Sequence, residues 1–339
     1  MLKKLFVGLL ALIAILVVVG FLLPDDFHLE RSVTIDAPAC TIFAQLDNFH
    51  RFNAWSPWAD IDPNAQYSIS GTPKSVGHKM SWASEDRNVG TGSQEITALE
   101  PYRRVESLLD FGDQGQPDVF FDLQPEGDAV KVVWGFDTSF EGSLIGRYFG
   151  LFFDNMIGPS YEKGLSRLKA VAEALPDTDW CDADIEITEV AERTIASTEG
   201  ESGTGSEEVS AAIGEAYGKV LGFLGKRNLQ AAGAPLTINK TWGEDGYQFE
   251  AAMPLATNPN LEAAEGAEVV IRDLPATRAV RLIQKGSYSQ MEGNYAALEA
   301  YLEANGLNAS GHSWAEYLND PATVAEEELV THIYIPVDS

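Results

Sequence analysis

The segment YGKVLGFL at residues 217–224 recurs as YAALEAYL at residues 295–302. Both segments carry apolar side chains at helical spacing, which predicts two matching helices. A strand-like run precedes each helix, IEITEV at 185–190 and VVIRDL at 269–274. A strand that ends near a proline closes each half, at 249–254 and 331–336. We therefore expect two strand-helix-strand-strand repeats that pair into one sheet, with a cleft near their pseudo-two-fold axis.

A different pattern fills the preceding residues, from 27 to 176. Short β-type runs are separated by Gly, Pro, Asn or Asp, as a series of hairpins requires. A short helix is expected at 40–49 and a long amphipathic helix at 156–175. The expected strands are 31–36, 66–70, 78–83, 93–99, 104–110, 118–124 and 130–138. This order predicts an α+β domain in which a curved antiparallel sheet encloses a cavity with the long helix, a common site for apolar ligands.

Four short motifs in this region resemble one known family. They are VTIDAP at 33–38, WSPW at 55–58, GTG at 90–92 and GLxxLK at 164–169. In this order they look like the START-like (SRPBCC, polyketide cyclase/dehydrase) superfamily. The resemblance implies a helix-grip fold that binds lipids, polyketides or other hydrophobic molecules, without a shared catalytic set. Trp55, Trp58 and Trp82 are the candidate cavity-lining residues.

The last 155 or so residues resemble a second family. The motifs are KGSY at 285–288, the helix at 295–302 followed by Asn305-Gly306, WAEY at 314–317 and THIYIPV at 331–337. They are similar to the GyrI-like domain, which also serves as the effector-binding domain of AraC-type regulators. The resemblance implies that Glu316 faces the cleft and contacts ligands, often aromatic cations. It also matches Tyr288 to the tyrosine that works with this glutamate in hydrolase members.

The residues around Glu316 support a binding role independently of the resemblance. Glu316 lies in a strand-like stretch between Trp314 and Tyr317. A buried carboxylate needs a partner, and aromatic walls beside a carboxylate suit a flat cation. Trp314 and Trp242 are expected near the same cleft, with Tyr288 as a pocket wall. The alternative is an exposed glutamate on an edge strand.

Other motifs exclude several kinds of site. The glycine-rich stretch EGESGTGSEE at 199–208 lacks the G-K-[ST] ending of a phosphate loop and predicts a surface loop. The five histidines have no metal-ligand spacing, and no G-x-S-x-G occurs. We therefore expect neither a metal nor a cofactor.

An apolar run precedes both domains. Residues 5–23 (LFVGLLALIAILVVVGFLL) contain no polar side chain and are long enough to cross a bilayer as a helix. Their summed insertion energy is roughly -4 to -9 kcal/mol. The run is longer than the apolar region of a signal peptide and no A-x-A-like site follows it, which favours an uncleaved anchor over a cleaved signal peptide.

Charge predicts the orientation and partners of the protein. Lys3 and Lys4 precede the apolar run, whereas Asp25, Asp26 and Glu30 follow it. The positive-inside rule then predicts a single-pass protein of the inner membrane, with its N-terminus in the cytoplasm and its domains on the outer, periplasmic side. The formal net charge of -28 disfavours nucleic acid as a partner.

The two cysteines, Cys40 and Cys181, lie near the two ends of the first domain. In an oxidising compartment they are able to form one bridge that closes a long loop. Two unrelated thiols are the alternative.

Together these features predict an anchor at 1–26, a START-like domain at 27–176, a linker at 177–181 and a GyrI-like domain at 182–339. The expected function is binding or sensing of a small hydrophobic or aromatic cationic molecule, in two cavities held beside a membrane. One alternative is an enzyme, either a hydrolase that uses Glu316 and Tyr288 or a cyclase-type activity in the first domain. The other is a structural or partner-binding protein whose clefts are filled by side chains.

Overall fold

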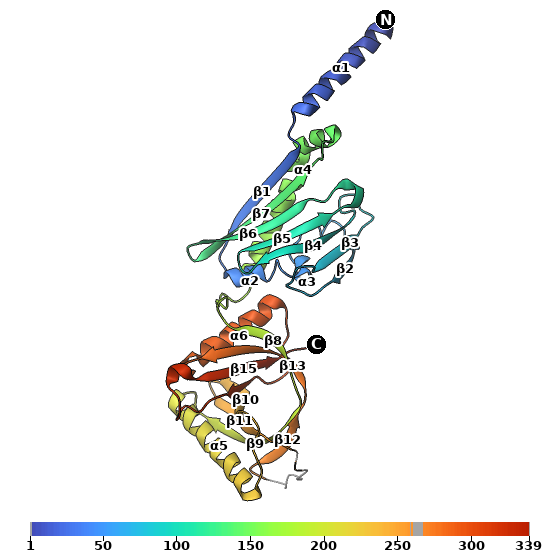
Figure 1. The fold of residues 1–339 in the computed structure, drawn as a ribbon. Coiled ribbons are helices and arrows are strands. Elements are labelled where there is room, and N and C mark those ends of the chain that lie inside the picture. The colour runs from blue at the N-terminus through green and yellow to red at the C-terminus, as the bar shows by residue number, and fades with distance from the viewer. Residues whose placement is uncertain (1, 258, 260–266, 339) are drawn as a thin grey trace. The chain divides into compact units, whose positions relative to one another are not determined.

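The chain forms two compact units, Met1–Cys181 and Asp182–Ser339 (Figure 1). The computed structural model describes residues 2–257, 259 and 267–338. Each unit is built on its own antiparallel sheet.

The first unit contains a seven-stranded sheet with the order β1-β7-β6-β5-β4-β3-β2. The short helices α2 (Ala39–Phe43) and α3 (Phe49–Phe52) lie between β1 and β2, and α4 (Leu144–Glu173) follows β7. The strands are β1 (Asp26–Ile35), β2 (Gln66–Ser70), β3 (Lys79–Ala83), β4 (Thr91–Glu100), β5 (Arg104–Asp110), β6 (Asp118–Glu126) and β7 (Ala129–Ser139). This arrangement confirms the predicted series of strands, although β1 begins five residues before its predicted start at residue 31.

The second half of α4 packs against the sheet, where Tyr161, Leu165 and Leu168 join the core of the unit. Close packing within the first sheet depends on Gly135 in β7. It pairs with Phe120 in β6, and a Cβ at Gly135 would lie 2.0 Å from the Phe120 ring. Only glycine therefore lets the aromatic ring lie flat over the neighbouring strand.

The predicted start of the long helix, at residue 156, is wrong by twelve residues. The helix begins at Leu144, where the Ser143 side chain accepts a hydrogen bond from the Gly146 amide. Its first turns expose large apolar residues, including Ile145 and Phe149. An apolar face directed away from the core breaks the amphipathic pattern on which the prediction depended.

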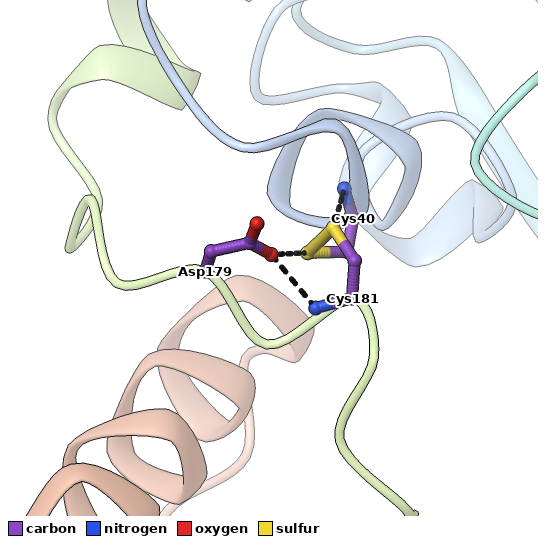
Figure 2. A group of neighbouring side chains, drawn as sticks. All are labelled: Cys40, Asp179 and Cys181. Atoms are coloured by element: carbon purple, nitrogen blue, oxygen red, sulfur yellow. Dashed lines mark hydrogen bonds between the residues drawn. A yellow bond between two sulfur atoms is a disulfide. The ribbon is translucent and has the colours of Figure 1, made fainter. Parts of the chain in front are cut away.

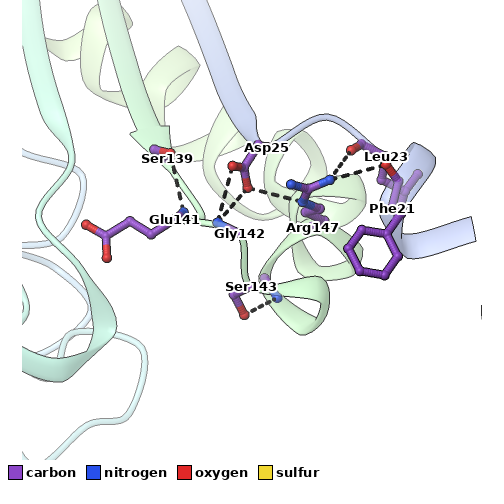
Figure 3. A network of polar contacts seen from close by, with 9 residues as sticks. Phe21, Leu23, Asp25, Ser139, Glu141, Gly142, Ser143 and Arg147 are labelled. Atoms are coloured by element: carbon purple, nitrogen blue, oxygen red, sulfur yellow. Dashed lines mark hydrogen bonds and ion pairs between the residues drawn. The ribbon is translucent and has the colours of Figure 1, made fainter. Parts of the chain in front are cut away.

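The apolar run forms the helix α1 (Leu2–Leu22). Among the described residues it is the one helix long and apolar enough to cross a membrane. Figure 3 shows how the chain leaves α1: the Arg147 guanidinium lies 3.1 Å from both the Leu23 carbonyl oxygen and an Asp25 carboxylate oxygen. The Tyr148 hydroxyl donates to the Leu16 carbonyl at 2.6 Å. These contacts join the end of α1 to the first turns of α4.

Cys40 and Cys181 form a disulfide, with their Cα atoms 5.1 Å apart (Figure 2). Cys40 lies in α2, and Cys181 ends the segment that follows α4. The Asp179 carboxylate accepts from the Cys181 amide at 2.9 Å and fixes this turn of the chain. The bridge therefore ties the last residues of the unit back to its first helix after β1.

The second unit contains an eight-stranded sheet with the order β12-β9-β11-β10-β14-β15-β13-β8. Its helices are α5 (Ser206–Arg227) and α6 (Met291–Asn305). The strands are β8 (Ile185–Val190), β9 (Arg193–Ser202), β10 (Leu236–Gly243), β11 (Gly246–Pro254), β12 (Val270–Leu274), β13 (Thr277–Lys285), β14 (Trp314–Tyr317) and β15 (Val330–Pro336). Each half thus has two strands ahead of its helix, one more than predicted.

The extra strand corrects the predicted surface loop at 199–208. Residues up to Ser202 belong to β9, and α5 starts at Ser206. Gly200 pairs with Phe249, and a Cβ there would lie 2.4 Å from the ring, so this glycine is needed for close packing within the sheet.

The strand order is symmetric about the centre of the sheet when β8–β11 of the first half are matched in sequence to β12–β15 of the second. The central pair is β10 with β14, and Thr237 opposes Ala315 at its middle. The first strand of each half pairs with the other half: β8 lies beside β13, and β12 beside β9. Neither half is therefore complete without the other.

Both helices of this unit contact the same face of the sheet. The Tyr217 hydroxyl of α5 lies 3.0 Å from the Thr237 hydroxyl, and Asn239 donates to the Tyr295 hydroxyl of α6 at 2.7 Å. Leu236 and Ile238 alternate with these residues along β10 and point to the opposite face. There they join an apolar cluster in which the described buried residues all come from strands: Ile195, Leu236, Ile238, Ala252, Ala279, Trp314 and Tyr334.

Candidate ligand-binding site

Glu316 lies at the centre of the second sheet, on the face opposite the helices. It belongs to β14, where it opposes Leu236 of β10 on one side and His332 of β15 on the other. Trp314 is two residues away and therefore shares this face. The Glu316 side chain is 13% exposed, so it is a nearly buried carboxylate and not an exposed edge residue.

Two donors hold the Glu316 carboxylate. The indole Nε1 of Trp314 donates to Glu316 Oε1 at 2.9 Å, and the Arg193 guanidinium donates to the same oxygen. Arg193 begins β9, which is separated from β14 by β11 and β10. Side chains stand roughly perpendicular to a sheet, so this contact indicates that the sheet curls toward the Glu316 face.

Aromatic rings lie beside this ion pair. Trp314 and Tyr334 stack with ring centroids 4.8 Å apart and planes inclined by 9°. Burial raises the pKa of Tyr334, and burial with the nearby Arg281 lowers the pKa of His332. Both side chains are therefore uncharged at neutral pH. The Nε–H groups of Arg193 and Arg281 are buried and have no hydrogen-bond partner among the described residues.

The structure does not bring Tyr288 to Glu316. Tyr288 packs edge-on against Tyr317, with centroids 5.6 Å apart. Tyr317 follows Glu316 in β14, so the two side chains point to opposite faces. Trp242 also lies away from Glu316: it opposes Tyr247, packs edge-on against that ring and is 61% exposed. Of the predicted residues in this unit, the structure places only Trp314 and Glu316 together.

The three candidate tryptophans of the first unit are engaged in packing. Trp55 is fully buried, and its Nε1 donates to the Gln45 carbonyl at 3.1 Å. Trp58 packs edge-on against Trp134. The Trp82 Nε1 donates to the Val89 carbonyl at 3.2 Å.

Side chains also occupy the space between α4 and the first sheet. Tyr161 of α4 stacks on Trp134 of β7 with ring centroids 3.9 Å apart. A surface hollow of about 670 Å³ lies elsewhere, lined by residues of β3, β4 and β5 and the turn at Phe111 and Gly112. It includes none of the three candidate tryptophans.

One group of the described residues has the spacing of metal ligands, namely Cys40, Asp179 and Cys181. Both sulfurs are joined in the disulfide. A metal ion binds cysteine as the thiolate, so the oxidised protein has no thiolate ligand at this place.

A second ion cluster supports the Glu316 face. Glu250 of β11 is buried and receives Arg272 at 3.0 and 2.7 Å and Lys240 at 3.1 Å. Burial alone would raise the pKa of Glu250. The hydrogen bonds and charge of Arg272, together with Lys240, outweigh it and lower the pKa from 4.5 to about 2.

This shift predicts a pH dependence of stability. A depressed carboxyl pKa contributes stability that is present above the unfolded-state value near 4.5 and is lost as the pH falls through about 2. We expect Glu250→Gln to remove on the order of 3 kcal/mol at neutral pH and to flatten the acid limb of the stability curve. Denaturant unfolding of the full chain between pH 2 and 7 measures both effects. The exposed Glu299→Gln serves as the control, and an equal loss in both variants would contradict the prediction.

Arg193 and Tyr334 are functional candidates that the sequence analysis missed. Arg193 lies 123 residues from Glu316 along the chain, at the start of the strand that was not predicted. The β-branched residues Thr194, Ile195 and Thr198 are the signal in the sequence that favours a strand there. Tyr334 lay within a predicted strand, but which face of the sheet its side chain occupies is known only from its pairing with Trp314 in the structure.

Comparisons with known proteins assign both units. Residues 26–173 match the family model for polyketide cyclase / dehydrase and lipid transport, and residues 183–338 match the model for the GyrI-like small molecule binding domain. A comparison with curated proteins gave no match.

Solved structures with similar folds share little sequence with this chain. The EcmrR C-terminal domain is 19% identical, with a TM-score of 0.38, over 47% of this chain and 99% of its own. A hydrolase from Listeria innocua is 15% identical, with a TM-score of 0.34, over 45% and 91%. SAV2435, bound to tetraphenylphosphonium, is 13% identical, with a TM-score of 0.34, over 46% and 94%. These similarities are too weak to bear on function. By its two family matches, the chain joins a polyketide cyclase/dehydrase and lipid transport domain to a GyrI-like small-molecule-binding domain.

Proposed function

We propose that this protein is a membrane-anchored small-molecule-binding protein whose ligand site is the face of the GyrI-like domain around Trp314, Tyr334 and Glu316. The observation that carries the proposal is the nearly buried Glu316 carboxylate beside two stacked aromatic rings, on the face of the sheet opposite α5 and α6. A few fixed polar groups within an apolar, aromatic surface are typical of small-molecule sites.

Arg193 narrows the class of ligand. Its guanidinium already neutralises Glu316, so a cationic ligand would have to break this ion pair before it reached the carboxylate. A neutral aromatic molecule has no such competitor and gains contact with Trp314 and Tyr334. The favoured ligand is therefore flat, hydrophobic and uncharged, and the aromatic cation of the family resemblance is the weaker candidate.

The proposal assigns one ligand site and not two. In the first unit, the Trp134–Tyr161 stack fills space between the sheet and α4. We assign that unit the task of connecting the anchor to the GyrI-like domain. Hydrolysis by Glu316 and Tyr288 is not proposed, because these side chains lie on opposite faces of β14.

Membrane anchoring by α1, with the domains on the outer side, is part of the same proposal. The length and composition of α1 support it. The Cys40–Cys181 bridge supports the outer location, because disulfides persist in oxidising compartments such as the periplasm.

The test is thermal unfolding of the full chain in detergent micelles with a library of neutral, cationic and anionic aromatic compounds. A ligand at 100 times its dissociation constant stabilises the folded state by about 2.7 kcal/mol. We expect neutral compounds to raise the melting temperature, Trp314→Leu to abolish the shift, and the same substitution at the exposed Trp242 to retain it. If no compound raises the melting temperature, or if Trp314→Leu binds like the wild type, the assignment of this site is wrong. The first of these results would favour a structural or partner-binding role.

A further inference from the structure

The first three turns of α4 expose a continuous apolar stripe. Ile145, Phe149, Phe152 and Met156 are 72%, 56%, 58% and 65% exposed. They follow one another at intervals of four, three and four residues, which places them on one face of the helix. Single exposed apolar residues are ordinary, but a contiguous group marks an interaction surface.

One flank of these turns is fixed to the domain, so the stripe cannot turn inward. The Phe140 ring lies against Gly150, where a Cβ would be 2.7 Å from the ring. Phe153 packs edge-on against Phe27 of β1, with ring centroids 5.3 Å apart. The helix is therefore held in a single orientation, with the stripe facing outward.

The stripe is continuous with the apolar surface of α1. Leu144 and Tyr148 lie on the flank of α4 beside the stripe, and both contact α1 at Gly20. Leu151, on the same flank, is also exposed. Apolar surface therefore runs from the candidate membrane span onto α4.

The depth of this contact fits the boundary of a bilayer. The Tyr148 hydroxyl bonds to the carbonyl of Leu16, six residues before α1 ends at Leu22. At 1.5 Å per residue, this contact lies about 9 Å inside the end of the helix. Interfacial amphipathic helices bury their apolar face by roughly 5–10 Å. A bilayer that reached the end of α1 would therefore also cover the first turns of α4.

The charge of the segment favours lipid over water. The chain carries a net charge of -28, yet residues 144–156 contain one acidic residue, Asp154, and one basic residue, Arg147. The Asp154 carboxylate is paired with the Arg31 guanidinium of β1 at 2.6 Å. Arg147 lies next to the carbonyls of Phe21 and Leu23, at the polar end of the span. Aromatic residues and a single cation at this level are typical of a membrane–water interface.

We propose that residues 144–156 lie in the interfacial layer of the same bilayer that α1 crosses, so that lipid is the partner of the exposed stripe. This inference rests on the proposed membrane anchoring. It assigns α4 two roles: the first turns hold the domain against the membrane surface, and the second half packs on the sheet.

The native disulfide makes a direct test possible. Because Cys40 and Cys181 are bonded to each other, a cysteine introduced elsewhere is the only free thiol of the full chain. Three single variants carry a bimane fluorophore: Phe149→Cys in the stripe, Leu12→Cys in α1, and Val76→Cys as a matched exposed apolar position in the loop between β2 and β3. Each substitution replaces an exposed side chain, so we expect the variants to fold like the wild type. The full-length variants are reconstituted in phosphatidylcholine vesicles that contain nitroxide-labelled lipids.

We expect a nitroxide near the lipid headgroup to quench most of the fluorescence of the label at position 149. A nitroxide deep in the acyl chain should quench most of the fluorescence of the label at position 12. The label at position 76 should keep its fluorescence with both. Quenching at position 12 but not at position 149 would overturn this inference and leave the anchor intact. If aqueous iodide does not reach the label at position 149 and nitroxide lipids do not quench it, another protein surface covers the stripe. That result would also overturn the inference that lipid is the partner. No lipid quenching at position 12 would overturn the anchor and the inference together.

Discussion

Replacing both Cys40 and Cys181 with serine is expected to lower the free energy of unfolding of the first unit by about 5 kcal/mol. The bridge spans 141 residues of sequence, and the loop-closure entropy that it removes from the unfolded chain grows with loop length. For a unit of this size, 1 kcal/mol corresponds to roughly 2–4 °C. The melting temperature of the unit should therefore fall by roughly 10–20 °C, as measured by calorimetry of the full chain in detergent.

Reductant provides the matched control for this prediction. Dithiothreitol should lower the melting temperature of the wild type to that of the double variant, and it should leave the double variant unchanged. A wild-type protein that titrates with two free thiols, or whose melting temperature ignores reductant, would contradict both the bridge and the oxidising location that it supports.

The first sheet was predictable because its strands alternate and are separated by turn residues. β2 and β5 begin and end where the sequence pattern predicted. The start of α4 was not predictable in the same way. Ile145 and Phe149 give the right spacing for a helix, but they point away from the core that a water-soluble domain would build. A rule that assumes every apolar face is turned inward misses a helix whose outer face is apolar.

The sequence predicted only some of the residues of the candidate ligand site. The position of Glu316 between Trp314 and Tyr317 indicated an unusual carboxylate, and its side chain is 13% exposed in the structure. Its partner Arg193 was hidden for two reasons. The glycine-rich end of β9 reads as a loop, and the strand order exchanges β8 and β12 between the halves, so neighbours in space are far apart in sequence. This exchange of strands between the halves depends on the whole sheet, and a local sequence pattern does not predict it.

The Arg193–Glu316 pair carries the second large prediction, which concerns ligand charge. In Arg193→Gln, the Glu316 carboxylate keeps the hydrogen bond from the Trp314 indole but loses its cationic partner. A flat aromatic cation that lies against Trp314 and Tyr334 then supplies a counter-charge to the carboxylate. We expect the affinity for N-methylacridinium relative to neutral acridine to rise by about tenfold or more, which equals about 1.4 kcal/mol. Fluorescence titration of the full chain in detergent at pH 8 measures the ratio.

The double variant Arg193→Gln/Glu316→Gln separates this effect from simple damage to the site. Removing one member of a nearly buried ion pair leaves an uncompensated charge, so Arg193→Gln alone should lose about 3 kcal/mol of stability. Removing both members should recover most of that loss, because the two amides carry no charge. The preference for the cation should then vanish, since no carboxylate remains to attract it. If the wild type and both variants all bind the two acridines in the same ratio, then Arg193 does not select the ligand by charge. The favoured neutral ligand would then have to be explained by shape alone, through the stacked rings of Trp314 and Tyr334.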